Sequence, residues 1–263
     1  FKDILKQQAI VNAGITFKFH DEESNEDFEY VYPEGIVGYI KELDNGKGFT
    51  LPVFYQKEGE GKDRDDKEEY KVKISFAFVF NNEVNNITYF HNSSWLENGG
   101  SPDKATRAAF VTAFDQMIKD NNKYSKGEDK ITFNDIQDSL IFISNTFSTQ
   151  TSYANQTKKA ISNKFIQDFM TKVILESLEI WMVENSIEAT KAMEQILANK
   201  HSRESADKQR LTMKKKLMSN IDINNQVKKF VDCRSKDVNK REVYIVEGDS
   251  ALGSCKLGRD AEF

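Results

Sequence analysis

The spacing of apolar residues along the first half of the chain predicts β-strands. Apolar and polar positions alternate in several stretches, as they do when one face of a strand is buried. These stretches are Ile15–His20, Phe28–Tyr32, Val72–Phe80 and Ile87–His91. The first two form a predicted hairpin across the acidic turn DEESNED, and the fourth returns after a turn at Asn81 and Asn82. The run LIFISNTF, which begins at Leu140, is typical of a strand buried on both faces.

Apolar residues three and four positions apart predict helices in the rest of the chain. The predicted helices are the amino-terminal FKDILKQQAIV, Gly35–Leu43, Pro102–Ile118, Phe133–Asp138, Lys158–Glu184 and Ile187 to about Met218. Ser101 suits the N-cap of the third helix, and Pro102 suits its first turn. The segment Gln56–Glu69 has seven acids, four bases and no apolar residue, so it predicts a solvated loop or an insertion.

The helix predicted from Lys158 places two lysines, Lys158 and Lys159, on its first turn within the sequence ANQTKKAI. The N-terminus of a helix already carries partial positive charge, and a cation there costs about 0.3–1 kcal/mol. Either both side chains point into water, or an anion such as a terminal phosphate binds at this end of the helix. The helical pattern by itself leaves both explanations open.

The composition predicts a soluble globular protein of one large or two modest domains, because 38% of the 263 residues are hydrophobic and 30% are charged. The net charge of −5 excludes a global basic field, so any nucleic-acid contact requires a local patch. Residues 200–216 provide a candidate patch, with seven basic and two acidic residues. The same excess of charge is also compatible with a solvated helix face.

The two cysteines, Cys233 and Cys255, and three scattered histidines provide neither metal-ligand spacing nor a disulfide framework. The sequence has no signal peptide and no apolar run of membrane-spanning length. These features predict a cytoplasmic location without membrane attachment. The chain begins without Met inside a helical pattern and stops just after a glycine-rich turn, so we expect a piece of a longer protein.

The string YIVEGDSALGSCKLGRD near the carboxyl end resembles the start of the TOPRIM domain in the B subunits of type IIA topoisomerases, DNA gyrase and topoisomerase IV. Leu252 stands where the family has Gly, and Cys255 where it has Ala. Glu247 follows a predicted buried strand, Val243–Val246, and the resemblance implies that it serves Mg²⁺-dependent DNA cleavage and religation as metal ligand or general acid/base. Without the resemblance, Glu247 is equally a strand-end carboxylate that caps the next turn.

Upstream segments resemble the same family in the same order. NQTKKAI is similar to the QTK loop of the transducer domain, GGSPDKATRAAF to its GGTH-containing helix start, and NDIQDSL to its REGL segment, with departures at Pro102, Gln137 and Ser139 among others. AIVNAGITFKFHDE is similar to the first strand of the domain. The resemblance implies that Gln156 and Lys158 contact the γ-phosphate of ATP held by an upstream GHKL domain, whereas Lys159 faces solvent.

The resemblance implies an α+β fold with a sheet backed by helices, a left-handed β-α-β crossover, long helices and the first strand of a TOPRIM α/β domain. A rule based on connection geometry alone would favour a right-handed crossover. The implied domains are a transducer domain over residues 1–184, a helical connector over 185–240 and the beginning of TOPRIM over 241–263.

The implied function is to couple ATP hydrolysis to DNA strand passage, with the isolated fragment inactive. Expected partners are DNA, a topoisomerase A subunit and a second B subunit in an A2B2 assembly, and expected cofactors are ATP and Mg²⁺. Candidate DNA contacts are Lys200, Arg203, Lys208, Arg210, Lys214, Lys215 and Lys216. The alternatives are a TOPRIM nuclease or primase, and a catalytically silent nucleic-acid-binding protein. The sequence does not separate gyrase from topoisomerase IV.

Overall fold

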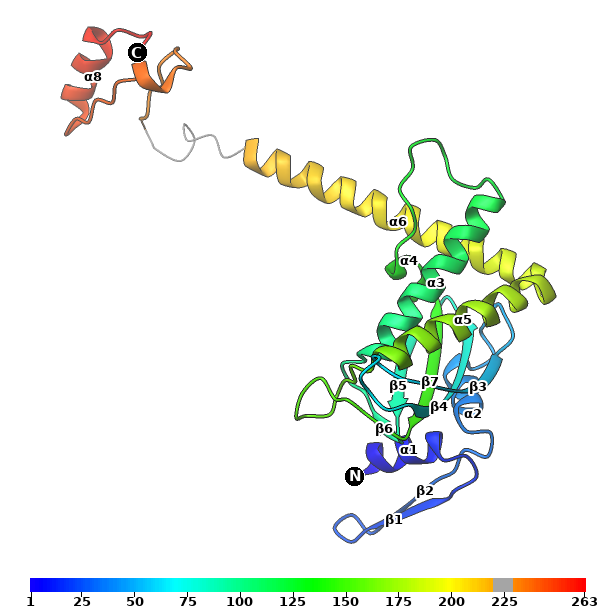
Figure 1. The fold of residues 1–263 in the computed structure, drawn as a ribbon. Coiled ribbons are helices and arrows are strands. Elements are labelled where there is room, and N and C mark those ends of the chain that lie inside the picture. Colours follow the sequence, from blue (N-terminus) through cyan, green and yellow to red (C-terminus); the bar gives the residue numbers. More distant parts are fainter. Residues whose placement is uncertain (220–228) are drawn as a thin grey trace. The chain divides into compact units, whose positions relative to one another are not determined.

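The computed structural model describes residues 1–219 and 229–263, and the side chains of residues 1–214 and 229–263 (Figure 1). The chain divides into two compact units, Phe1–Glu204 and Ser205–Phe263. The first unit is a mixed α+β domain built on a five-stranded sheet, which confirms the predicted fold class.

The sheet of the first unit has the strand order β3-β4-β7-β5-β6. Its strands are β3 (Val53–Gly61), β4 (Tyr70–Phe80), β5 (Asn86–His91), β6 (Ser94–Trp95) and β7 (Leu140–Ser148). β7 pairs antiparallel with β4 and parallel with β5. β5 therefore returns antiparallel to β4, as predicted, but β7 lies between the two strands.

Two helices form the β-α-β crossover that the parallel pair requires. α3 (Ser101–Asp120) and α4 (Phe133–Gln137) connect β5, through β6, to β7. The left-handedness of this crossover stays a prediction from the family resemblance.

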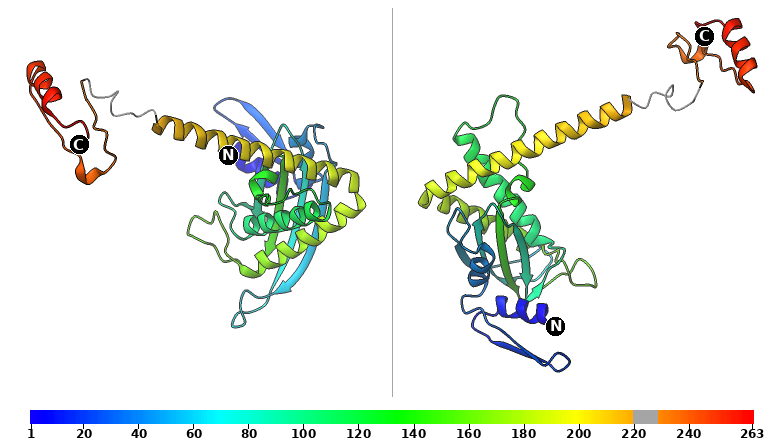
Figure 2. Two further views of the ribbon diagram at one scale, coloured as in Figure 1. Left: turned by 90° about the horizontal axis from the view of Figure 1, so that it is seen from above. Right: turned by 180° about the vertical axis from the view of Figure 1, so that it is seen from behind.

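Helices cover both faces of the sheet (Figure 2). α3 and α5 (Lys164–Glu184) pack on one face, and α1 (Lys2–Val11) and α2 (Ile36–Asp44) pack on the other. Because successive side chains of a strand point to opposite faces, β4 sends Phe76, Phe78 and Phe80 toward α3 and α5, and Ala77 and Val79 toward α2. The central strands are therefore buried on both sides.

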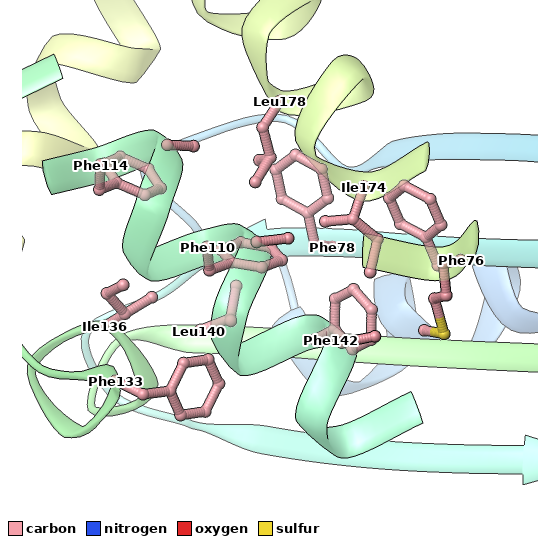
Figure 3. Close-up of a cluster of buried hydrophobic side chains, with 14 of the residues drawn as sticks. Phe76, Phe78, Phe110, Phe114, Phe133, Ile136, Leu140, Phe142, Ile174 and Leu178 are labelled. Atoms are coloured by element: carbon pink, nitrogen blue, oxygen red, sulfur yellow. The ribbon is translucent and has the colours of Figure 1, made fainter. Parts of the chain in front are cut away.

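Aromatic rings dominate the core between the sheet and helices α3 and α5 (Figure 3). Phe78 meets Phe110 and Trp181 edge to face, with ring centroids 5.7 and 5.3 Å apart. Phe142 of β7 meets Phe110 in the same way, at 5.6 Å. Such edge-to-face pairs add specific geometry to the burial of large apolar surfaces. This cluster joins β4, β7, α3 and α5 into one body.

The alternating pattern at the start of the chain forms the predicted hairpin, β1 (Phe17–Asp21) and β2 (Glu26–Tyr30). The prediction of a solvated loop over Gln56–Glu69 is wrong in its first part, because β3 continues to Gly61 and pairs with β4. A Cβ on Gly59 would lie 2.5 Å from the ring of Phe169, and a Cβ on Gly61 would lie 2.4 Å from the ring of Phe165. Aromatic side chains of α5 thus cover a stretch of strand that has no apolar residue of its own.

Two predicted helix starts are also corrected. α5 begins at Lys164, not Lys158. Gly100 rather than Ser101 is the N-cap of α3, and the Ser101 hydroxyl instead donates to the carbonyl oxygen of Ile161 at 3.2 Å. Both corrections concern the loop between β7 and α5, which packs against the start of α3.

The last long helix, α6 (Ser186–Ser219), begins two residues after the end of α5. Its first part buries Ala189, Ala192, Met193 and Ile196 in the core of the first unit. The compact unit therefore extends to Glu204, into the predicted connector. Residues 220–228 of that connector lie outside the described residues.

The second unit contains a 3-10 turn η1 (Val238–Lys240) and helix α8 (Asp249–Gly258). The strand predicted at Val243–Val246 is absent, and Ile245 is 92% exposed. A strand needs a neighbour to satisfy its backbone and to cover its side chains. No described strand pairs with these residues, so their apolar pattern alone does not produce one.

Replacing Phe78 with Ala tests the aromatic core. Phe78 is fully buried between α3, α5 and the sheet, so its truncation should lower the free energy of unfolding by about 3–5 kcal/mol. Phe54 of the edge strand β3 is 45% exposed, and Phe54→Ala should cost less than about 1 kcal/mol. Urea unfolding followed by tryptophan fluorescence measures both values. Equal losses in the two variants would contradict this description of the core.

Candidate functional site

The loop of residues 149–163 joins β7 to α5 and projects from the first unit (Figure 1). Tyr153 and Ile161 form an antiparallel bridge between its two legs. The Ala154 amide donates to the Ala160 carbonyl at 2.9 Å, and the Ser162 amide donates to the Ser152 carbonyl at 2.7 Å. The base of the loop is thus held by backbone pairing, and its tip, residues 155–158, is exposed.

The tip is a turn and not a helix, so the prediction that Lys158 and Lys159 lie on a first helical turn is wrong. Lys158 has φ 57°, in the left-handed region that few residues other than Gly and Asn adopt. Its amide donates to the Asn155 carbonyl at 3.3 Å, and the Thr157 hydroxyl donates to the Asn155 side-chain oxygen at 2.6 Å. Turn geometry rather than helix geometry therefore directs Gln156 and Lys158 outward.

The two lysines differ in their electrostatic partners. Lys159 forms an ion pair with Glu97, so its charge is matched although its side chain stays half exposed. The Lys158 ammonium lies over the Tyr153 ring, 5.5 Å from its centroid, and forms no ion pair with any carboxylate of the described residues. An exposed, uncompensated ammonium on a held turn is suited to bind an anion that approaches from outside the chain.

Gly100 fixes the second leg of the loop against the start of α3. Its backbone forms a parallel bridge with Ile161, and the Ser101 amide donates to the Ile161 carbonyl at 2.9 Å. Gly100 has φ 90°, and a Cβ at this position would lie 2.2 Å from the Ile161 oxygen. Only glycine allows this approach, which explains why Gly100 precedes the helix.

An anion does lie at the N-terminus of α5, and it belongs to the chain itself. The Phe165 amide donates to Oδ1 of Asp63 at 2.8 Å. This carboxylate satisfies an amide that the helix leaves unpaired and complements the helix dipole. Asp63 lies in the acidic segment 56–69, and nothing in the sequence pattern distinguishes it from its six acidic neighbours. Sequence reasoning therefore missed it.

His91, at the end of β5, holds the first leg of the loop. It is fully buried, and its Nδ1 and Nε2 each lie 2.8 Å from a threonine hydroxyl, that of Thr146 in β7 and that of Thr151 in the loop. Burial lowers the pKa of His91 to about 4. The imidazole is therefore neutral at pH 7 and bridges the sheet to the loop. The scattered position of His91 in the sequence gave no signal for this contact.

The predicted basic patch divides into residues with structural partners and exposed residues. Lys200 is fully buried, with its ammonium 2.6 Å from Glu128, so its prediction as a DNA contact is wrong. The Arg203 guanidinium donates to both oxygens of Asp135, at 2.6 and 3.1 Å. The hydrogen bond from Lys200 is the largest cause that lowers the pKa of Glu128, to about 2. These ion pairs attach α6 to the segment that surrounds α4.

The other basic residues lie on the later part of α6. Lys208, Arg210 and Lys214 are exposed, so they stay available for contact with an external polyanion. The side chains of Lys215 and Lys216 lie outside the described residues. The candidate DNA patch is therefore reduced to three described side chains.

Glu247 is exposed and directly precedes Gly248, which has φ 83° and is the N-cap of α8. Its neighbour Asp249 forms an ion pair with Lys229. No three His, Cys, Asp or Glu side chains of the described residues come together in a way that would hold a metal ion. Glu247 alone is not a metal site, and the described part of the chain does not complete one.

The described helices also include none that could span a membrane.

The fold of this chain is similar to that of solved ATP-binding domains from topoisomerase IV and DNA gyrase. It resembles the topoisomerase IV ATP-binding domain of Francisella tularensis with a TM-score of 0.58 and 22% identity, over 77% of this chain and 52% of that one. It also resembles the 43K ATPase domain of Thermus thermophilus gyrase B with a TM-score of 0.58 and 20% identity, over 80% of this chain and 55% of that one. At this level of identity, the likeness establishes the fold.

The sequence establishes the family. A family model described as DNA gyrase B matches residues 35–212, and the chain belongs to that family. The DNA gyrase B subunit of Metamycoplasma arthritidis is 31% identical over 98% of this chain and 40% of its own length. That of Campylobacter jejuni is 28% identical over 98% of this chain and 32% of its own length. The chain thus spans less than half the length of these relatives.

The stability of the first unit should depend on pH through His91. An unfolded histidine binds a proton near pH 6.5, whereas folded His91 does so only near pH 4, so its contribution is complete above pH 6.5 and is lost as the pH falls toward 4. Between pH 7 and 5 the loss should be roughly 1–2 kcal/mol. Replacing His91 with Gln should remove this component, whereas replacing the exposed His20 with Gln should keep it. Urea unfolding at pH 7 and pH 5 measures the loss of unfolding free energy in each protein. Equal losses in the parent and in both variants would contradict this role of His91.

Proposed function

We propose that this chain is part of the B subunit of a type II DNA topoisomerase and that its 149–163 loop contacts the terminal phosphate of ATP bound by another domain. The observation that carries the proposal is the exposed Lys158 ammonium, which has no described carboxylate partner, beside a Lys159 that is paired with Glu97. Gln156, on the same exposed turn, supplies an amide donor. Membership of the DNA gyrase B family supports the same assignment.

The loop lies where it can connect nucleotide state to the rest of the chain. Lys158 and Gln156 bind and orient the terminal phosphate, and this interaction ends when that phosphate leaves after hydrolysis. The second leg of the loop continues directly into α5, which is packed on the sheet and is followed by α6. The two helices carry the change toward the DNA-cleaving part of the enzyme.

Other assignments extend the same proposal. Exposed Lys208, Arg210 and Lys214 contact DNA phosphates, and Glu247 joins further acidic residues, beyond those described, to hold Mg²⁺ for cleavage and religation. Mg²⁺ would supply charge neutralisation at the scissile phosphate. The partners are a topoisomerase A subunit and a second B subunit in an A2B2 assembly, in the cytoplasm.

Two findings support the proposal over its rivals. The match of the gyrase B family model begins at residue 35 and ends at residue 212, upstream of the TOPRIM-like string. A TOPRIM nuclease or primase would give no reason for that match, and neither would a binding protein that keeps only the basic helix. The relatives from Metamycoplasma arthritidis and Campylobacter jejuni are both gyrase B subunits, which favours gyrase over topoisomerase IV.

The substitution Lys158→Ala in the full-length parent subunit tests the proposed phosphate contact. Removal of a charged donor that acts on the transferring phosphoryl group should lower the rate of ATP hydrolysis about 10²-fold or more. ATP binding should persist, because other contacts hold the rest of the nucleotide. Hydrolysis is measured with a coupled-enzyme assay, and binding with labelled nucleotide.

Lys159→Ala is the matched control, since it removes the same charge from a residue that is already paired with Glu97. Hydrolysis by this variant should stay within about threefold of the parent rate. Equal losses of ATP and ADP affinity in Lys158→Ala would show a folding role and refute the phosphate contact.

A triple replacement of Lys208, Arg210 and Lys214 with Gln tests the DNA patch. If all three bind phosphates, the slope of log affinity against log salt should become shallower by about 0.9 for each side chain replaced. DNA stimulation of ATPase activity should fall, and cleavage-site preference should not change, because phosphate contacts carry no direct sequence information. The control replaces Lys18, Lys41 and Lys47 with Gln, because this changes the net charge by the same amount as the first triple variant. An unchanged slope in the first triple variant would reduce the patch to a solvated helix face.

A further inference from the structure

We infer that Asp63, from the acidic turn between β3 and β4, is the positioning residue that joins the 149–163 loop to helix α5 as one unit. The inference rests on the proposed function of the loop as a phosphate contact. Asp63 does not approach the exposed tip, and it acts through Asn163 and the first turn of α5.

Three structural elements donate hydrogen bonds to the Asp63 carboxylate. Oδ1 accepts from the Tyr70 hydroxyl of β4 at 2.7 Å and from the Phe165 amide of α5 at 2.8 Å. Oδ2 accepts from Nδ2 of Asn163, at the end of the loop, at 3.0 Å. Tyr70 and Asn163 are almost fully buried, at 3% and 1% exposed. Both oxygens of the carboxylate are thus occupied by donors from separate elements.

Asn163 extends this contact to the other leg of the loop. Its Oδ1 accepts from the Ser152 amide at 2.7 Å, while its Nδ2 also lies 3.1 Å from the Tyr70 hydroxyl. The carbonyl of Ser152 in turn accepts from the Ser162 amide. A continuous set of hydrogen bonds therefore runs from Asp63 through Asn163 to both legs of the loop.

The charge of Asp63 suits this place. A carboxylate at the N-terminus of a helix is favourable because it meets unpaired amides and the positive end of the helix dipole. Burial, together with the hydrogen bond to Asp63, raises the pKa of Tyr70, so its phenol remains a donor at neutral pH. By contrast, Asp65 and Asp66 in the same turn are exposed and pair with the nearby Lys62 and Arg64.

A functional consequence follows from this connectivity. When the tip engages a phosphate, the displacement of the second leg reaches α5 only if Asn163 and the first helical turn move together. Loss of Asp63 leaves the tip residues in place but separates the loop from the helix. The turnover number kcat should then fall, while KM for ATP changes little, because Asp63 touches no nucleotide.

The test uses the full-length parent subunit with Asp63→Ala, and with Asp65→Asn as the matched control from the same turn. We expect Asp63→Ala to lower kcat for DNA-stimulated ATP hydrolysis about ten- to a hundredfold with KM within about twofold, since a misplacement of about 1 Å caused by a distant substitution can cost up to about 10²-fold. Hydrogen exchange at the amides of Ser152 and Phe165 should become faster. The Asp65→Asn variant should match the parent in both measurements.

A reciprocal double variant separates positioning from simple loss of stability. Combining Asp63→Asn with Asn163→Asp exchanges donor and acceptor, so the amide introduced at position 63 donates to the carboxylate introduced at position 163. This pair should recover most of the kcat and the slow exchange that Asp63→Asn alone loses. Recovery of thermal stability without recovery of kcat would overturn the inference.

The outcomes distinguish this inference from the proposed function. If Lys158→Ala abolishes hydrolysis and Asp63→Ala leaves kcat and exchange unchanged, the inference is wrong and the phosphate contact stands. If Lys158→Ala retains full hydrolysis, the proposed function is wrong. In that case, hydrogen exchange at the Ser152 and Phe165 amides of Asp63→Ala still decides whether Asp63 holds the loop. Unchanged exchange rates would overturn the inference.

Discussion

The pairing of β7 with two different neighbours is the constraint on which the rest of the first unit depends. β7 lies between β4 and β5, with one antiparallel and one parallel ladder, and it is buried on both faces. Its parallel pairing with β5 requires a crossover, which places α3 on the aromatic face of the sheet. Its end determines where the 149–163 loop leaves the sheet, beside the start of α3. The candidate site is therefore a consequence of sheet order.

Ion pairs within the chain determine which basic residues remain available to bind an external anion. Lys159, Lys200 and Arg203 are each matched by a carboxylate, whereas the described residues provide none for Lys158. Lys200 is buried, where an unpaired ammonium would be strongly unfavourable, so its contact with Glu128 offsets the cost of burying that charge. A count of basic residues along the sequence treats all of them alike. Their tertiary partners separate structural cations from cations that can meet an external anion.

An element can be predicted from the sequence when its own side chains are the ones that become buried. β4 and β7 were predicted because their own side chains carry the apolar pattern. The continuation of β3 to Gly61 was missed because Phe165 and Phe169 of α5 cover its glycines, and a strand covered from elsewhere has no periodicity of its own. Residues 243–246 show the opposite case, an apolar run without a described partner strand. Lys158 and Gln156 were identified from family resemblance, but their turn geometry and the role of Asp63 were not.

The sequence by itself determined the family, the α+β class and the positions of the elements that bury their own apolar residues, because these depend on local order along the chain. Tertiary structure alone decided that β7 separates β4 from β5, that Asp63 is the anion at the N-terminus of α5, and that Lys200 is buried. Each of these contacts joins residues that are more than 50 positions apart in the sequence. Periodicity reports only near neighbours, so contacts of this kind become visible only when the chain is folded.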